Sequence, residues 1–181
     1  MRIVAGLWRG RALLSPPGQE TRPTADRVRQ TLFDILLHAP WAGRALLEGA
    51  SVLDVFAGTG ALGLEALSRG AAHATFIERA RPALIALRAN IAACQAEPRC
   101  TVLILDALAA PEGDRAGLVF LDPPYGQDMI PRALTRLRNV GRIGPGSMIV
   151  AETGRDEPGF DVDVLSERMT GAARVTIWRE G

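Results

Sequence analysis

The chain has 181 residues, of which 48% are hydrophobic and 23% are charged, and its formal net charge is +1. This length and composition predict a single globular domain, residues 1–181, with a sizeable hydrophobic core. No apolar run approaches the ~18 residues of a membrane span and the N-terminus has no signal-peptide core, so we expect a cytoplasmic protein without membrane contact.

The first 24 residues form a basic segment rich in Gly, Pro and Arg. Short apolar pieces, Arg2–Ala5 and Arg11–Leu14, surround two glycines and predict a β-hairpin or extended arm followed by a loop. Such an arm can hold a phosphate backbone, although a solvated charged face is the alternative. The first thirty residues hold only two acids, against these arginines: Arg2, Arg9, Arg11, Arg22, Arg27 and Arg29.

From residue 24 onward, predicted helices alternate with predicted strands. Thr24 can cap a helix that runs to about His38. Further helices are predicted over 61–69, 82–93 and 130–140, and strands over 52–56, 74–77, 101–105, 117–121 and 147–151. Residues 162–164 and 173–178 are predicted to close the fold as an antiparallel pair. The alternation indicates an α/β fold, with a mostly parallel seven-stranded sheet and helices on both faces.

A glycine-rich turn follows the first strand of the α/β body. Gly58, Gly60 and Gly63 fit a dinucleotide fingerprint, and Glu78 lies near the spacing expected of an acid that binds ribose hydroxyls. The turn alone is compatible with NAD or with S-adenosylmethionine. Asp54 favours the second, because a carboxylate suits the cationic methionine portion and would repel a pyrophosphate.

Each of the first four strands of the body ends at or near an acid, namely Asp54, Glu78, Asp106 and Asp122. Ligands of open α/β sheets lie at the carboxyl ends of the strands, so these acids are expected to share one site. We expect Glu78 to bind the ribose and Asp106 to accept from the adenine amine. The predicted cofactor-binding residues are Asp54, Phe56, Ala57, Gly58, Gly60, Glu78, Asp106 and Ala107.

The tetrapeptide Asp122-Pro123-Pro124-Tyr125 follows the fourth strand and is the most specific signal in the chain. An exocyclic amine on a base is a poor nucleophile, because its lone pair is delocalised into the ring. The Asp122 carboxylate and the Pro123 carbonyl can accept from the amine and favour the geometry that frees the lone pair. Tyr125 offers a face on which an extracted base can stack. We therefore predict Asp122, Pro123, Pro124 and Tyr125 as the catalytic residues.

Neither a metal nor a covalent intermediate is expected. Cys94 and Cys100 lack metal-ligand spacing, and His38 and His73 are the only histidines. Methylation at cytosine C5 would need a nucleophilic cysteine, and neither cysteine lies in a comparable loop.

The turn Asp54–Gly60 resembles motif I of class I methyltransferases, which have a Rossmann-like fold. The chain as a whole resembles the bacterial 16S ribosomal RNA guanine-N2 methyltransferases of the small-subunit methyltransferase D family. The resemblance covers nearly the whole chain. It rests most on Met1–Arg11 and Arg22–Phe33, and also on Phe56–Gly70. The chain departs from the family in having no lysine among its basic residues and in its last strand, which ends Val175-Thr176-Ile177-Trp178.

The resemblance implies S-adenosylmethionine as cofactor and N2 of a guanosine in 16S ribosomal RNA as target. The partner is then the small ribosomal subunit or its assembly intermediate. It also implies that residues 1–24 form an RNA-binding extension, with Arg2, Arg9, Arg11, Arg22 and Arg27 as the contacts. No long apolar edge or association helix is evident, so we expect a monomer.

Three other functions remain open on the sequence. A DNA adenine-N6 methyltransferase uses the same tetrapeptide, although this chain is short for a target-recognition domain. An NAD-dependent enzyme would use the same glycine turn. A catalytically silent RNA-binding assembly factor would keep its cellular function after Asp122→Ala.

Overall fold

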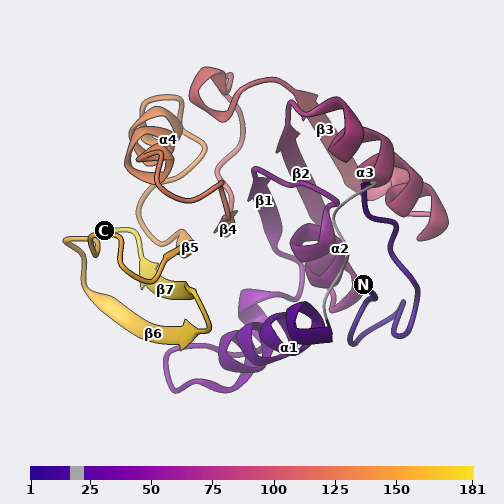
Figure 1. The fold of residues 1–181 in the computed structure, drawn as a ribbon, viewed down its shortest axis with the longest axis horizontal. Helices are drawn as coiled ribbons and strands as arrows, with labels where there is room; N and C mark the ends of the chain where they lie inside the picture. The colour runs from indigo at the N-terminus through magenta and orange to yellow at the C-terminus, as the bar shows by residue number, and fades with distance from the viewer. Residues whose placement is uncertain (17–22) are drawn as a thin grey trace.

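Residues 1–16 and 23–181, which the computed structural model describes, fold around a sheet of seven strands (Figure 1). The order of the strands is β3-β2-β1-β4-β5-β7-β6. β1 to β5 are parallel, while β7 is antiparallel to both β5 and β6. The strands are β1 (Ser51–Val55), β2 (His73–Glu78), β3 (Cys100–Ile104), β4 (Leu118–Leu121), β5 (Met148–Gly154), β6 (Val164–Thr170) and β7 (Ala173–Arg179).

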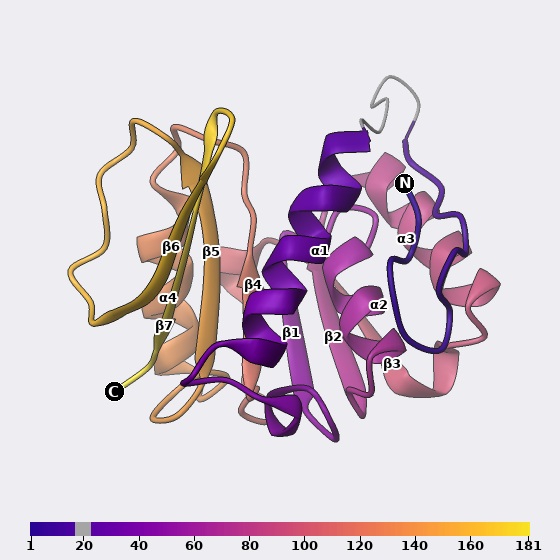
Figure 2. The same ribbon diagram turned by 90° about the horizontal axis from the view of Figure 1, so that it is seen from below.

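Helices cover both faces of this sheet (Figure 2). The helices α1 (Pro23–His38), α2 (Ala61–Ser68) and α3 (Arg81–Ala93) pack on one face, and α4 (Met129–Asn139) packs on the other. Short 3-10 turns are η1 (Arg44–Leu46), η2 (Glu97–Arg99) and η3 (Ala107–Ala109). Because successive strand residues face opposite sides, Phe120 packs toward α1 while Val119 and Leu121 pack toward α4. The predicted α/β architecture, a class I methyltransferase fold, is confirmed.

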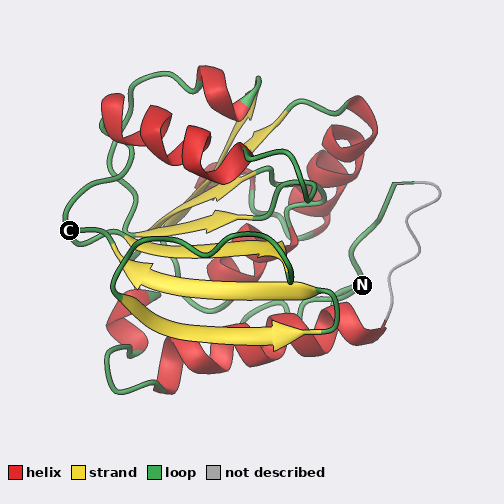
Figure 3. Ribbon diagram, turned by 60° about the vertical axis from the view of Figure 1, so that its left-hand side comes forward, coloured by secondary structure: helices red, strands yellow, loops and turns green. Residues whose placement is uncertain are grey.

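The edge of the sheet departs from the prediction (Figure 3). The last antiparallel pair is β6 with β7, so the strand predicted over 162–164 was wrong in all but Val164. β6 is an edge strand whose Glu167 and Arg168 are exposed, and its sequence therefore lacks the apolar run of a buried strand. Helix α1 also starts one residue before Thr24, at Pro23, a residue that suits a first helical position.

The N-terminal arm, residues 1–16, is a short β-hairpin, one of the two predicted forms. One antiparallel bridge joins Arg2 and Ala12. Around it the N–H groups of Ile3, Gly10 and Leu13 donate to the carbonyls of Arg11, Ile3 and Met1, each at 2.9 Å. The N–H groups of Val4 and Ala5 donate to the Glu65 carboxylate on α2, at 2.7 and 3.0 Å, and so tie the hairpin to the body of the fold.

The sheet has its topological switch point between β1 and β4. The chain runs outward from β1 through β2 to β3, then returns to β4 on the other side of β1. Connections on either side of this point diverge, which leaves a crevice at the carboxyl ends of the strands.

Candidate active site

A cleft of about 1130 Å³ opens at the carboxyl ends of β1, β2, β4 and β5. One side is walled by Val28, Arg29 and Leu32 of α1. The cleft brings together most of the predicted cofactor residues and all four predicted catalytic residues: Asp54, Phe56, Ala57, Gly58, Glu78, Asp106, Ala107, Asp122, Pro123, Pro124 and Tyr125.

Gly60 is the predicted cofactor residue that does not line the cleft. It is buried with φ +77°, and a Cβ there would lie 2.3 Å from a Leu87 methyl carbon of α3. Gly60 therefore lets helix α3 pack against the start of helix α2. In this structure Gly60 allows close packing, and its contact with a cofactor stays a prediction.

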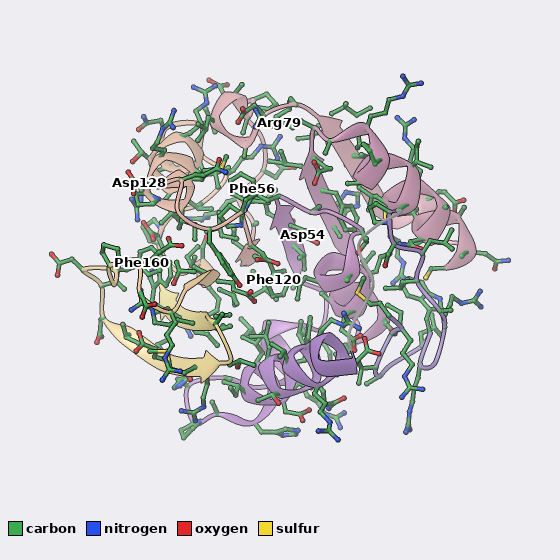
Figure 4. All side chains as sticks on the ribbon, in the orientation of Figure 1. Asp54, Phe56, Arg79, Phe120, Asp128 and Phe160 are labelled. Atoms are coloured by element: carbon green, nitrogen blue, oxygen red, sulfur yellow. The ribbon has the colours of Figure 1, made fainter. Side chains whose placement is uncertain are left out.

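Asp54 is the last residue but one of β1, and Phe56 follows the strand at the start of the glycine turn (Figure 4). Asp54 is only 2% exposed, and its Oδ2 accepts from the Gly63 N–H at 2.9 Å. Burial raises the pKa of Asp54 to about 8; the bond from Gly63 opposes this shift, and the charges of Asp122 and Glu78 add to it. Phe56 has φ +64°, so the turn holds a bulky residue in a strained left-handed conformation.

Glu78 ties the glycine turn to the β2–α3 connection. Its Oε2 accepts from the Gly58 N–H at 2.8 Å, while its Oε1 accepts from the N–H groups of Arg79 and Ala80, each at 2.7 Å. These bonds orient the carboxylate at the cleft wall. Glu78, which the sequence analysis predicts to bind a ribose, thus also fixes the backbone of the glycine turn and of the β2–α3 connection.

Asp106 follows β3 and caps the short turn η3. Its Oδ1 accepts from the Leu108 N–H at 2.9 Å, and its Oδ2 pairs with Nη1 of Arg79 at 2.5 Å. The Arg79 side chain is 64% exposed, so this ion pair lies at the open rim and contributes little stability. It does fix the direction of Asp106 within the cleft.

The candidate catalytic loop, Asp122–Gly126, follows β4 and is bonded to residues of β5 and of the segment after it. The Tyr125 hydroxyl donates to Oε1 of Glu152 at 2.6 Å, and the Gly126 N–H donates to Oε1 of Glu157 at 2.9 Å. The Tyr125 ring remains 46% exposed, which leaves its face open to the cleft.

Asp122 lies at the cleft with part of its surface open to solvent and the rest against protein atoms. Burial on the protein side and the charge of Glu152 both raise its pKa above the ordinary aspartate value. Burial and the bond to Glu152 likewise raise the pKa of Tyr125, so this hydroxyl remains a hydrogen-bond donor. The loop therefore presents an unusually basic carboxylate next to an aromatic face.

Glu152 and Glu157 are site residues that the sequence analysis missed. Glu152 lies near the end of β5 and lines the same cleft, so it continues the series of acids at strand ends by one strand. The pattern that indicated the first four acids could have found it. Glu157 carried no comparable signal, because its bond to Gly126 joins segments 31 residues apart.

The predicted RNA contacts fall into two groups. Arg2 and Arg27 are exposed near the start of α1; Arg2 lies 3.8 Å from Asp26 on that helix. Arg9 and Arg11 belong to the turn of the arm, and Nη1 of Arg11 donates to the carbonyl of Ala93, the last residue of α3, at 2.5 Å. That end of α3 lies away from the cleft. Arg22 lies outside the described residues.

The described residues also bear on the sequence predictions about metals, cysteines and membrane spans. No group of three or more His, Cys, Asp or Glu in it could hold a metal ion, and Cys94 and Cys100 are unpaired thiols. None of the helices over residues 1–16 and 23–181 is both long enough and apolar enough to cross a membrane.

Comparisons with known proteins match the chain over its whole length. The family model described as conserved hypothetical protein 95 matches residues 1–179. The ribosomal RNA small subunit methyltransferase D of Haemophilus influenzae is 34% identical over 187 residues, covering 99% of this chain and 93% of the relative. The protein of that name from Escherichia coli K12 is 39% identical over 155 residues, covering 84% and 74%. Among solved structures, the methyltransferase yhhF of Escherichia coli is similar with a TM-score of 0.84 and 36% identity, covering 99% of this chain and 98% of that one.

Proposed function

The chain belongs to the family described as conserved hypothetical protein 95, and from this membership we propose that it methylates the N2 amine of a guanosine in 16S ribosomal RNA. Its relatives named ribosomal RNA small subunit methyltransferase D support a ribosomal RNA methyltransferase. The observation that carries the proposal is the cleft itself, because the glycine turn and the Asp122–Tyr125 loop line one cavity.

The proposed methyl donor is S-adenosylmethionine, which supplies an electrophilic methyl group when bound. Glu78 would hold its ribose, Asp106 and Ala107 its adenine, and Asp54 its cationic end. Two observations support the fit. Asp54 is a buried acid whose charged form a neighbouring cation would stabilise. The Ser15 hydroxyl also lines the cleft and is buried without a hydrogen-bond partner among the described residues.

The residues of the catalytic loop would act on the target amine. Asp122 and the Pro123 carbonyl accept its two hydrogens, which aligns the nitrogen lone pair for attack on the methyl carbon. When the nitrogen has taken the methyl group, whose bond to the sulfonium sulfur breaks in the same displacement, the nitrogen must lose one proton. The raised pKa of Asp122 makes its carboxylate a suitable acceptor. Tyr125, held by Glu152, would stack on the base and fix its plane.

We also propose that the N-terminal segment, residues 1–24, and the start of α1 contribute to RNA binding through their arginines. Arg2 and Arg27 are the candidates nearest the cleft wall. Arg9 and Arg11 would reach RNA that extends past the arm toward the far end of α3.

The first test is methyl transfer from labelled S-adenosylmethionine to small ribosomal subunits from cells lacking this protein. Label in N2-methylguanosine is the expected result. Label in N6-methyladenosine would contradict the guanine assignment, and transfer to DNA alone would favour the DNA methyltransferase. Binding of cofactor without transfer to either polymer would favour the silent assembly factor.

The same assay tests the role of Asp122. Asp122→Ala is expected to abolish transfer while S-adenosylmethionine binding, measured by calorimetry, stays nearly unchanged, because Asp122 acts on the amine. The matched control is Asp114→Ala, in the exposed loop before β4, which should retain full transfer. Loss of cofactor binding in Asp122→Ala would instead place this carboxylate in the cofactor site.

A further inference from the structure

Two carboxylates stand side by side at the floor of the cleft. β4 and β5 pair in parallel with Leu121 opposite Ala151, and Asp122 and Glu152 are the residues that follow this last registered pair. Adjacent strands lie about 4.8 Å apart. Asp122 and Glu152 come two residues after Phe120 and Val150, which pack on the α1 side of the sheet. Both acids line the cleft.

Glu152 is held in place by only one of its oxygens. Oε1 accepts from the Tyr125 hydroxyl at 2.6 Å, and Oε2 accepts no hydrogen bond from the residues that the structure describes. Its charge is close enough to raise the pKa of Asp122. Within the described ranges, no arginine forms an ion pair with either acid. Two neighbouring carboxylates without a cationic partner repel each other. They therefore favour a ligand that brings two neighbouring N–H donors.

The Watson–Crick edges of the bases differ in what lies beside the amine. In guanine the C2 amine adjoins N1–H, so the two neighbouring positions are both donors. In adenine and cytosine the amine adjoins a ring nitrogen with a lone pair, which accepts. A second carboxylate beside Asp122 would therefore bind guanine and repel the lone pair of the other two bases.

We propose that Glu152 is the residue that selects guanine, with Oε2 accepting from N1–H while Asp122 accepts from the C2 amine. This inference rests on the proposed function and assigns its base specificity. Tyr125 then has two roles, since its ring stacks on the base and its hydroxyl orients the selecting carboxylate. Glu152 touches the substrate but takes no part in bond making.

The test uses reconstituted small subunits that carry either guanosine or 2-aminopurine ribonucleoside at the mapped target position. The analogue keeps the C2 amine but has an unprotonated N1. The wild-type protein should prefer guanosine. Glu152→Gln should lower kcat/KM on guanosine by about tenfold, since an amide N–H replaces the acceptor or competes with it. The same N–H can donate to N1 of the analogue, so the preference for guanosine should shrink or invert.

The controls separate specificity from folding. Because 2-aminopurine also lacks O6, the measured quantity is the ratio of guanosine to analogue rates, compared between variants. Glu97→Gln, an exposed acid in η2, should leave that ratio at the wild-type value. Glu152→Ala should lower guanosine transfer and gain less on the analogue than Glu152→Gln does, because it removes the carboxylate that repels N1 but offers no donor to it. All variants should bind S-adenosylmethionine as the wild type does.

An unchanged ratio in Glu152→Gln, with normal cofactor binding, would overturn the assignment of Glu152 and leave the proposed function standing. Failure of the proposed function would be seen in the wild-type protein instead of in the Glu152 variants. If the wild-type protein puts no label into N2-methylguanosine, the target is wrong whatever the variants do.

Discussion

Asp54 is a carboxylic acid that the fold keeps almost entirely from water, although it borders the cleft. Its pKa of about 8 means that the folded protein holds a proton that the unfolded chain releases near pH 4. Because the folded state binds the extra proton, stability is greatest below pH 4 as far as this group is concerned. It falls as the pH rises through the window from about 4 to about 8.

Asp54→Asn should remove this dependence, since the amide oxygen can still accept from Gly63 but carries no charge. We expect the variant to gain stability relative to the wild type as the pH rises, by up to about 5 kcal/mol at pH 8. Urea denaturation of both proteins at pH 5, 6.5 and 8 measures the difference. Parallel pH profiles would show that Asp54 titrates normally.

At the same scale, Asp122 and Glu152 show how the neighbours of a residue set its chemistry. Alone, each is an ordinary strand-end acid. Side by side, with Tyr125 bonded to one of them, they form the pair of acids that the proposed function places against the target base. The variants of Asp122 and Glu152 therefore test catalysis and base selection separately.

At the scale of elements, the N-terminal arm is joined to the body by buried polar contacts. Glu65 of α2 is fully buried and accepts from the N–H groups of Val4 and Ala5 while pairing with Arg69 at 2.8 Å and Arg29 at 3.5 Å. A buried carboxylate is tolerated only with this many partners. Glu65 thus holds the arm, α1 and α2 together behind the cleft.

Gly6 and Gly10 offer a matched pair of substitutions in the arm. Both have positive φ, +81° and +84°, but an added Cβ at Gly6 would lie 1.9 Å from the Ser68 carbonyl oxygen, whereas Gly10 faces open space. Gly10→Ala should cost about 1–2 kcal/mol from the left-handed conformation alone. Gly6→Ala should cost more and release the arm, because the backbone must move away from Ser68.

Urea denaturation gives the two free energies of unfolding, and limited proteolysis reports release of the arm. We expect faster cleavage within residues 1–16 in Gly6→Ala only. Equal destabilisation and equal cleavage in the two variants would show that the contact with Ser68 does not hold the arm.

At the scale of the whole molecule, the arginines proposed to bind RNA lie in two places, one at α1 and one near the end of α3. Arg27 belongs to α1 and Arg2 lies beside that helix, each next in sequence to a residue that lines the cleft, while Arg11 reaches the end of α3. Phosphate contacts from either end release counterions and make RNA binding depend on salt. Contacts close to the cleft should also influence how the base enters it.

Replacing Arg2 and Arg27 with Ala should lower RNA affinity, flatten the slope of log K against log salt by about 1–2, and slow methyl transfer. Replacing Arg9 and Arg11 should flatten the slope similarly but leave kcat nearly unchanged. Filter binding to 16S ribosomal RNA across a potassium chloride series measures both, with a double Ala variant of Arg44 and Arg132, outside the arm and α1, as control. An unchanged slope in a variant would assign that pair of arginines to a solvated surface.

Much of the architecture followed from local signals in the sequence. Glycine turns, helix starts and apolar periodicity predicted the alternation of β1 to β5 with helices, because these signals act over a few residues. The edge strand β6 was missed, since its exposed polar residues carry no such signal. The acids at strand ends were predicted to meet, and Asp54, Glu78, Asp106 and Asp122 do line one cleft.

The sequence by itself thus determined the α/β fold and the family, and it predicted which acids would meet at one cleft. Only the tertiary structure decided which groups face each other there. It set Glu152 beside Asp122, directed the Val4 and Ala5 donors to Glu65, and packed Gly60 against Leu87. The physical reason is distance along the chain. Partners 30 or 60 residues apart leave no local pattern, and their pairing depends on how the strands and helices pack.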